Sequence, residues 1–382
     1  MSPSAVVLTG GIIVEPEGER QTNLWIKDGL IERVGPDQPS AGDYEKIAVS
    51  GCYVTPGLFD LQVNGGFGCD LWADPSPEQF TKMARAMLSR GVTSFLPTLI
   101  TDSVEHLHKN IQFLESLGAG QLAGTFAPDG RRWPRLPGIH LEGPFLSPEK
   151  PGVHPPEHIQ KLSIEAVELV LSPSVRLMTV APETACDEAP IRLLRDSHVV
   201  VSLGHSNATY AEARLAFDAG VRLMTHTFNA LPGIHHRSPG AVTAALLDER
   251  VHCCVIADGL HVAPAIVQLI YKTKGRDRTV LVTDIAQIGT SGGGLVGSSI
   301  TLDEAVRNLV AWQVCSFADS VRMATSNPAS VLGLSDRLGS LKEGALADIV
   351  VWDQSTLQVK KVFIAGQLIT SSLHDRGMSQ LR

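Results

Sequence analysis

Through the middle of the sequence, short apolar runs alternate with helical segments, and few folds accommodate that rhythm. The eight runs of β type end near Asp60, Pro97, Glu142, Ala181, His205, His226, Asp258 and Asp284. Parallel strands need a crossover between them, so the alternation predicts a parallel sheet covered by helices. Eight such units in about 280 residues match an α/β fold of the (β/α)8 TIM-barrel type. A doubly wound open sheet is the alternative with the same local pattern.

Two of the predicted helices carry clear end signals. Ser76-Pro77-Glu78-Gln79 has the form of a capping box with proline at the first helical position, and Gly91 ends that helix. A later helix is expected to be capped by Ser206 or Asn207 and to end at Gly220.

Both ends of the chain have the pattern of β structure. Residues 24–31 are two apolar runs around Asp28-Gly29, which is typical of a hairpin with a type I′ turn. Short β-type runs also occupy residues 347–352 and 359–364. Neither end has enough strands for a stable sandwich by itself. We therefore predict one small discontinuous β-sandwich domain from residues 1–55 and 343–382, with the barrel at 56–342.

Composition excludes several classes of partner. With 32 Lys+Arg against 40 Asp+Glu, the net charge of −8 disfavours binding to nucleic acid or to a membrane surface. No apolar run approaches the ~20 residues that span a bilayer, and the start lacks a signal-peptide pattern. The six cysteines form no C-x-x-C pair and are interpreted as reduced thiols. We expect a soluble cytoplasmic protein.

Polar side chains recur where the predicted strands end. Glu142, His205, His226 and Asp284 each close an apolar run, and in a barrel these ends converge on one mouth. Two histidines and a glutamate form a known ligand set for catalytic zinc that leaves a position open for water. Glu142, His205 and His226 are therefore predicted metal ligands. The alternative is that each is an ordinary polar side chain satisfied at its strand end.

Asp284 suits a second role at the same mouth. Attack of water on an amide needs a base, and the departing amine needs a proton. One carboxylate near the water can serve both steps in turn. The alternatives are that Asp284 caps the following helix or ligates the metal itself.

Several motifs resemble a known family. The segments that carry the resemblance are residues 56–65 (PGLFDLQVNG), 140–145 (HLEGPF), 204–208 (GHSNA), 225–230 (THTFNA), 282–284 (VTD), 297–303 and 323–329. Together they resemble the N-acetylglucosamine-6-phosphate deacetylases of the amidohydrolase superfamily. The first motif alone marks only the superfamily.

The resemblance implies a metal-dependent hydrolase. The family's metal ligands correspond to Glu142, His205 and His226, and its catalytic aspartate to Asp284. Many superfamily members carry His-x-His at the end of the first strand, where this chain has Gln62 and Asn64. Amides are poor ligands for transition metals, so one divalent ion per subunit is expected. Zn2+ is the first expectation, with Fe2+, Mn2+ or Co2+ as alternatives.

The implied reaction converts N-acetyl-D-glucosamine 6-phosphate to D-glucosamine 6-phosphate and acetate in amino-sugar metabolism. Arg237 corresponds to an arginine that binds the sugar phosphate across a homodimer interface, and a guanidinium suits phosphate because it offers paired donors. His261 corresponds to a sugar- or phosphate-contacting histidine and His154 to one near the scissile amide. The other implied substrate contacts are Val153, Asn229, Ala230, Asp258, Gly259, Leu260, Leu295, Val296 and Gly297.

Two other functions remain open at this point. One is an amidohydrolase that acts on a cyclic amide or an aminopurine, although dinuclear members of that kind would require His-x-His in place of Gln62 and Asn64. The other is a non-catalytic barrel that serves as a scaffold, against which the four polar strand ends argue. The glycine-rich stretch 289–294 is shorter than is usual for the family and is expected to affect closure over the substrate.

Overall fold

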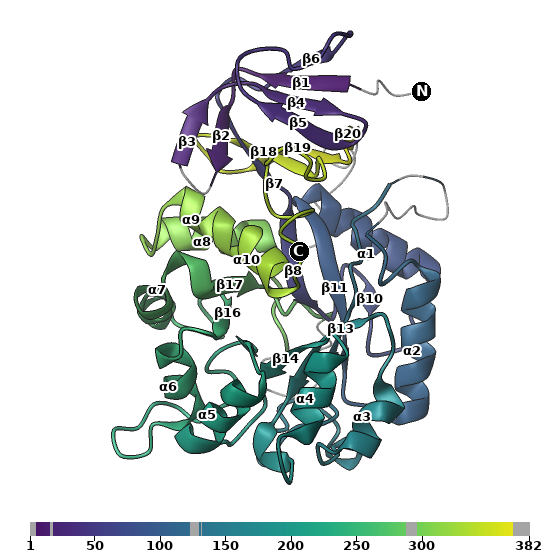
Figure 1. The fold of residues 1–382 in the computed structure, drawn as a ribbon, viewed down its shortest axis with the longest axis vertical. Coiled ribbons are helices and arrows are strands. Elements are labelled where there is room, and N and C mark those ends of the chain that lie inside the picture. The colour runs from purple at the N-terminus through teal and green to yellow at the C-terminus, as the bar shows by residue number, and fades with distance from the viewer. Residues whose placement is uncertain (1–4, 16–17, 123–129, 131, 288–295, 370–382) are drawn as a thin grey trace.

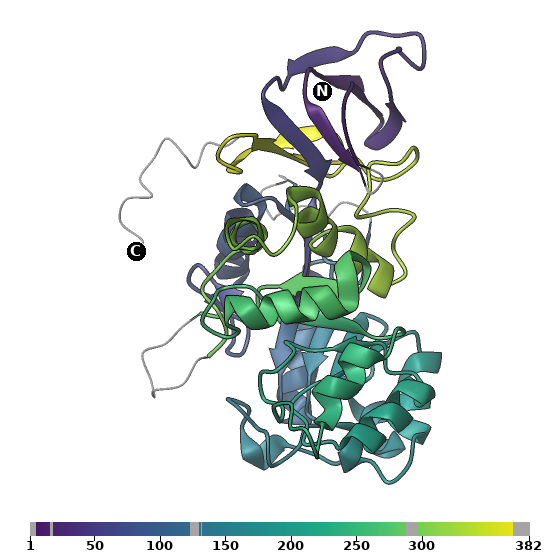
Figure 2. The ribbon, with the colours of Figure 1, turned by 90° about the vertical axis from the view of Figure 1, so that its left-hand side faces the viewer.

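A computed structural model describes residues 5–15, 18–122, 130, 132–287 and 296–369. A small β domain, built from both ends of the chain, sits at one end of a larger α/β barrel (Figures 1 and 2). Among the described residues, no helix combines the length and the apolar character needed to cross a bilayer.

Eight parallel strands form the barrel, and each pairs with the next one along the chain. They are β8 (Leu58–Val63), β11 (Val92–Ile100), β12 (Ile139–Glu142), β13 (Val175–Val180), β14 (Val200–Leu203), β15 (Leu223–Met224), β16 (His252–Ile256) and β17 (Thr279–Val282). A parallel bridge between Val63 and Ile285 joins the last strand to the first. The predicted (β/α)8 barrel is confirmed, and the doubly wound sheet is wrong because the strand order never reverses.

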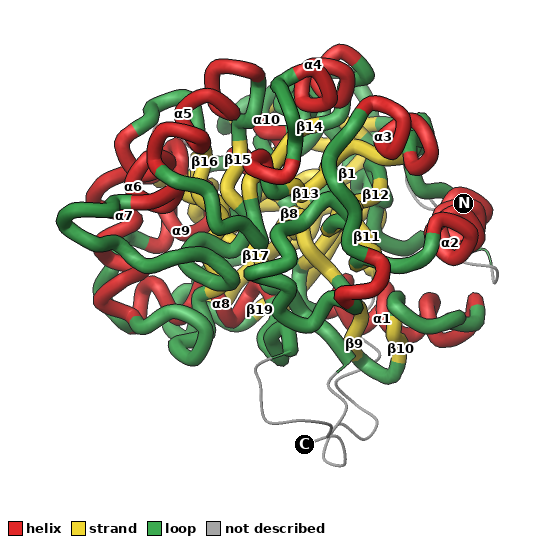
Figure 3. The backbone as a smooth tube through the Cα atoms, turned by 90° about the horizontal axis from the view of Figure 1, so that it is seen from below, coloured by secondary structure: helices red, strands yellow, loops and turns green. Residues whose placement is uncertain are grey.

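Helices surround these strands, as the view along the barrel shows (Figure 3). They are α1 (Pro77–Ser89), α2 (Val104–Ser116), α3 (Ile164–Val170), α4 (Ala189–Asp196), α5 (Tyr210–Ala219), α6 (Gly240–Leu247), α7 (Pro264–Arg278), α8 (Leu302–Ala311), α9 (Phe317–Met323) and α10 (Ser326–Val331). Short 3-10 turns, η1 (Pro156–His158) and η2 (Pro182–Thr184), lie in the loops after β12 and β13. The predicted capping box of α1 is confirmed, with reciprocal bonds between Ser76 and Gln79.

The predicted start of α5 is wrong by a few residues. Thr209 caps this helix through a capping box with Glu212, whereas Ser206 and Asn207 do not. Those two residues donate instead to Glu183, from the Ser206 hydroxyl at 2.7 Å and from the Asn207 N–H. The end of α5 at Gly220 is confirmed, with φ of +139°.

The small domain contains two sheets, as predicted. One consists of β1 (Ala5–Thr9), β4 (Leu24–Lys27), β5 (Leu30–Val34) and β6 (Glu45–Ala48). The other consists of β2 (Ile12–Glu15), β3 (Gly18–Gln21), β7 (Cys52–Pro56), β18 (Ile349–Asp353), β19 (Val359–Ile364) and β20 (Gln367–Ile369). A separate two-stranded ribbon, β9 (Gly65–Gly66) and β10 (Cys69–Asp70), follows the first barrel strand.

Turn chemistry sets the strand arrangement in this domain. Asp28 and Gly29 both have positive φ, so the predicted hairpin between β4 and β5 is confirmed. The run from Val6 to Val14 divides at Gly10, where φ is +79°, and its two halves enter different sheets. The domain boundaries near residues 55 and 343 stay a prediction, and residues 370–382 lie outside the described part.

A buried ion pair joins the two domains at the end of the barrel remote from the polar strand ends. Asp348 immediately precedes β18, and Arg135 precedes β12. The Arg135 guanidinium donates to both carboxylate oxygens of Asp348, and the Ala365 N–H donates to Asp348 Oδ1 at 2.8 Å. Both charged side chains are almost fully buried. Removal of either side chain would therefore leave the other charge buried without its ion-pair partner.

We predict that Asp348→Asn destabilises the protein by about 3–5 kcal/mol, because it leaves the Arg135 charge buried and unpaired. Urea unfolding monitored by circular dichroism measures this. The exposed pair between Lys342 and Asp336 supplies the control, since Asp336→Asn should leave the urea midpoint almost unchanged. Equal effects of the two substitutions would contradict the prediction.

Candidate active site

Three predicted ligands meet at the C-terminal mouth of the barrel. Glu142 ends β12, and His205 and His226 follow β14 and β15. Glu142 Oε1 lies 2.8 Å from His226 Nε2 and 3.2 Å from His205 Nε2, and these two nitrogens are 3.1 Å apart. All three side chains are buried. Their ligand atoms thus form a compact triangle supplied by three strands.

Unusual backbone conformations aim these side chains. His205, His226 and Asp284 have φ of +46°, +24° and +52°, in the left-handed region that residues other than glycine seldom adopt. Such a conformation costs about 1–3 kcal/mol per residue and persists only where the surrounding structure imposes it. The strain coincides with the polar strand ends that the sequence singled out.

The tautomer of His205 suits a metal ligand. Its Nδ1 lies 3.0 Å from the carbonyl oxygen of Lys150, which can only accept, so the proton is on Nδ1. In the neutral ring the lone pair on Nε2 therefore faces Glu142 Oε1, 3.2 Å away. A proton or a metal ion between these two atoms satisfies both of them. A carbonyl acceptor on the outer nitrogen is the usual support for a metal-binding histidine.

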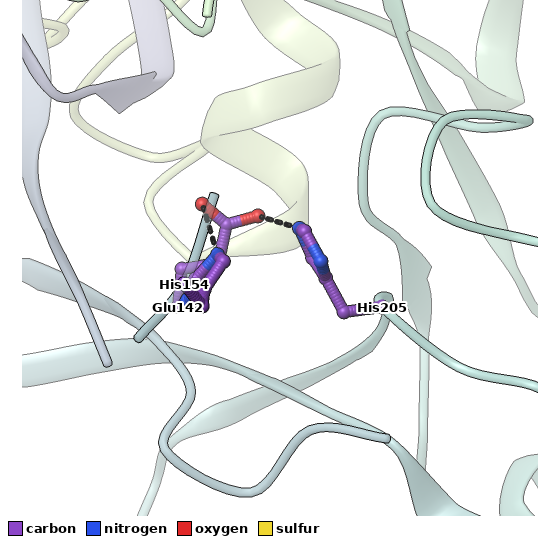
Figure 4. A group of neighbouring side chains, drawn as sticks. All are labelled: Glu142, His154 and His205. Atoms are coloured by element: carbon purple, nitrogen blue, oxygen red, sulfur yellow. Dashed lines mark ion pairs between the residues drawn. The ribbon is translucent and has the colours of Figure 1, made fainter. Parts of the chain in front are cut away.

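His154 lies beside the triangle with the opposite tautomer. Its Nδ1 accepts the backbone N–H of Thr101 at 3.3 Å, so the proton is on Nε2, which lies 4.0 Å from Glu142 Oε2. Figure 4 shows the two Glu142 oxygens directed toward His154 and His205. Burial and the neighbouring His205 charge lower the pKa of His154 to about 3, which keeps the ring neutral. It can donate a hydrogen bond into the site.

Two sets of residues could hold a metal ion by distance. One is Glu142 with His205 and His226, and the other is Glu142 with His154 and His205, whose ligand atoms lie within 4.8 Å of one another. A metal needs a lone pair on each ligand atom, and the protonated Nε2 of His154 offers none. The chemistry therefore favours the set that contains His226.

The electrostatics of the triangle favour a cation. Burial alone would raise the pKa of Glu142, but its contacts with His205 and His226 hold it well below the usual range. Burial alone would lower the pKa of His226, but the hydrogen bond and the charge of Glu142 raise it to about 9. Both shifts follow from the opposite charges of the carboxylate and the histidines, and a carboxylate in this position also attracts a metal cation. The donor set fits a divalent transition metal.

Asp284 follows β17 and lies across the mouth from Glu142. Its N–H donates to the carbonyl of Gln62 at 3.0 Å, and its own carbonyl accepts the N–H of Ser298 at 2.8 Å. Burial raises the pKa of Asp284 to about 7, and the negative charge of Glu142 adds to the rise. A carboxylate with this pKa can take and return protons near neutral pH. Asp284 does not cap the following helix, α8, which Thr301 caps.

The predicted substrate residues lie around the rim. Asp258 Oδ2 accepts a hydrogen bond from His261 Nδ1 at 2.6 Å, and this bond orients the His261 ring at the end of β16. Arg237 is exposed on the loop before α6 and contacts none of the triangle residues. The other predicted contacts fall into three groups: Val153 and Leu260 are exposed, Asn229, Ala230, Gly259, Val296 and Gly297 are half-buried, and Leu295 lies outside the described residues.

Backbone packing explains one of these positions. A side chain at Gly297 would place its Cβ 2.6 Å from the carbonyl oxygen of Asp284, so glycine lets the chain pass close to that residue. The glycine-rich stretch 289–294 also lies outside the described residues, and its expected effect on closure stays a prediction.

Sequence reasoning missed several residues that support the site. Gln62 and Asn64 were considered only as missing ligands, yet both contact site carboxylates. Thr101 follows β11 and sets the tautomer of His154. Glu183 follows β13 and holds the loop after His205, and its signal was available because it is another carboxylate beyond an apolar run.

The sequence profile of the Amidohydrolase family matches residues 53–369. The match covers the whole barrel, nearly all of β7 and the C-terminal strands of the small domain. The chain therefore belongs to the amidohydrolase family.

Its relatives within the family are deacetylases of amino-sugar phosphates. N-acetylgalactosamine-6-phosphate deacetylase of Escherichia coli O157:H7 is 34% identical, over 90% of this chain and 94% of the relative. N-acetylglucosamine-6-phosphate deacetylase of Bos taurus is 33% identical, over 95% and 93%. An Asp-to-Ala variant of the Mycobacterium smegmatis N-acetylglucosamine-6-phosphate deacetylase, solved with N-acetyl-D-glucosamine-6-phosphate, has a TM-score of 0.84 at 30% identity, covering 96% and 99%. The resemblance drawn from the motifs is confirmed.

The two possible ligand sets lead to a test. We predict that His226→Gln loses bound metal while His154→Gln keeps it, because the protonated Nε2 of His154 has no lone pair to give to a metal ion. Metal content after dialysis, measured by plasma mass spectrometry, reports the difference. His205→Gln, which removes a ligand common to both sets, is the positive control. Retention of metal by His226→Gln together with loss by His154→Gln would assign the ligand role to His154.

Proposed function

We propose that this protein hydrolyses the acetamide of an N-acetylated hexosamine 6-phosphate, with N-acetyl-D-glucosamine 6-phosphate as the first substrate. The products are D-glucosamine 6-phosphate and acetate. The observation that carries the proposal is the buried triangle of Glu142, His205 and His226 with Asp284 at the same barrel mouth. The names of relatives that match nine-tenths or more of the chain support the substrate class.

Glu142, His205 and His226 would hold one divalent ion, Zn2+ first among the candidates. When bound, such an ion polarises a carbonyl and lowers the pKa of water. Asp284 takes a proton from the attacking water and later returns it to the leaving nitrogen. The Nε2–H of His154 donates to the acetyl oxygen as negative charge develops there.

The phosphate is assigned to the rim of the site. Arg237 offers paired N–H donors, and His261 offers a ring oriented by Asp258. We assign Arg237 to the site of a second subunit in a homodimer, a role supported by its exposure on the loop before α6. We further place the enzyme in the cytoplasm, because phosphorylated sugars are charged metabolites.

The galactosamine epimer is a second candidate substrate. The relative from Escherichia coli O157:H7 carries that specificity in its name, and its identity to this chain equals that of the glucosamine-specific relatives within a few per cent. Cyclic amides, aminopurines and a scaffold role find no comparable support among these relatives.

Acetate release from purified protein tests the proposal. The two N-acetylhexosamine 6-phosphates are compared with N-acetylglucosamine lacking the phosphate, and a parallel arm contains a chelator. We expect release from at least one phosphorylated sugar, little from the unphosphorylated sugar, and none after chelation. Equal rates on phosphorylated and unphosphorylated sugar would refute the phosphate assignment, and full activity with chelator would refute the metal.

Asp284→Asn should abolish turnover and leave the metal content unchanged, because an amide can neither take nor return the proton. Steady-state acetate release and metal analysis of the same sample measure the two properties. Loss of metal in this variant would instead make Asp284 a ligand. Normal turnover would remove it from the mechanism.

Arg237→Ala should chiefly raise KM, because its contact with the phosphate lies far from the reacting amide. Arg192, an exposed arginine on α4, supplies a matched control as Arg192→Ala. Kinetics over a range of substrate concentrations separate KM from kcat. An effect confined to kcat would count against phosphate binding by Arg237.

A further inference from the structure

Two amide side chains on the first barrel strand each donate to one carboxylate of the site. Gln62 Nε2 lies 3.0 Å from Glu142 Oε2, and Asn64 Nδ2 lies 2.6 Å from Asp284 Oδ1. Gln62 lies on β8 and Asn64 directly follows it, two positions further on, so both side chains point to the same side. Both are almost completely buried.

We propose that Gln62 and Asn64 are positioning residues. Each binds one oxygen of a site carboxylate and leaves the other oxygen for the reaction. The roles of the reserved oxygens rest on the function proposed above.

The two oxygens of Glu142 have separate partners. Oε1 lies within 3.2 Å of both His226 Nε2 and His205 Nε2, whereas Oε2 accepts from Gln62. A carboxylate on a flexible side chain can otherwise rotate and bind through either oxygen or both. The Gln62 donor fixes the rotation and leaves Oε1 as the oxygen that faces the two histidines. Gln62 should therefore control how tightly the first ion binds.

Asn64 divides the oxygens of Asp284 in the same way. A carboxylate only accepts, so the amide nitrogen of Asn64 must face Asp284 Oδ1, and this assignment also fixes the carbonyl end. No described residue donates to Asp284 Oδ2, which leaves that oxygen for a water molecule. The buried Asn64 Oδ1 likewise lacks a partner among the described residues. Asn64 should therefore control the proton-transfer step more than metal binding.

Apolar variants test the two positioning roles separately. Gln62→Leu should weaken metal binding roughly 10–100-fold, the range typical of a lost outer partner, as measured by chelator competition. Asn64→Leu should lower kcat by a similar factor of roughly 10–100, with KM and metal affinity within about twofold of the unsubstituted protein. Asn110→Leu is the matched control, because Asn110 is a buried amide on α2 outside the site. It should change neither property.

Near-isosteric variants give a second test of the two positioning roles. Gln62→Met and Asn64→Asp keep the side-chain shapes and remove the N–H donors, so they remain informative if a leucine variant fails to fold by circular dichroism. Gln62→Met should weaken metal binding and Asn64→Asp should lower kcat, each by a factor similar to that of the leucine variant.

Two results would overturn the inference: unchanged metal affinity in Gln62→Leu and Gln62→Met, or unchanged kcat in Asn64→Leu and Asn64→Asp. A general packing defect would instead lower the melting temperature and shift metal affinity and kcat together in both leucine variants, which also counts against it. If the unsubstituted protein released no acetate, the proposed function would fail, whereas the metal measurements would still decide the role of Gln62.

Discussion

A carboxylate buried at the end of β12 requires positive charge or hydrogen-bond donors around it, and the surrounding site meets that requirement. Glu142 has two histidine nitrogens near one oxygen and the Gln62 amide at the other. The Nε2 atoms of His205 and His226 both face the same carboxylate oxygen, so a proton or a metal ion can lie between the histidines and Glu142. The burial of the carboxylate is therefore the reason that the site can bind a cation.

Beneath the ligands, the barrel interior is polar where apolar layers are usual. Thr225 lies next to His226, and its hydroxyl bonds to Ser202 and to Thr179 at 2.7 Å. Thr179 bonds in turn to His140, two residues before Glu142, at 2.8 Å. All of these side chains are buried. This network ties together the strands that carry the ligands and helps to maintain the strained conformations at their ends.

The small domain contributes at the opposite end of the barrel. β7 ends at Pro56 and β8 begins at Leu58, and the N–H of Gly57 between them donates to the Asp348 carbonyl at 2.9 Å. Gln62 and Asn64 lie at the other end of that strand. The strand β8 therefore connects the small domain at one end to the donors of the site at the other.

The sequence by itself determined the barrel, the sandwich from both termini and the polar strand ends, because these follow from local periodicity and from turn residues such as Asp28-Gly29.

Tertiary structure alone decided which atoms meet. The cap of α5 moved to Thr209 because Glu183, distant along the chain, accepts from Ser206 and Asn207. The choice between His154 and His226 depends on the tautomer that Thr101 imposes on His154 from another loop. Gln62 and Asn64 have a role only through carboxylates 80 and 220 residues away. Hydrogen bonds are short-ranged and directional, so a pattern along the chain can identify the donors, but only the folded chain assigns their acceptors.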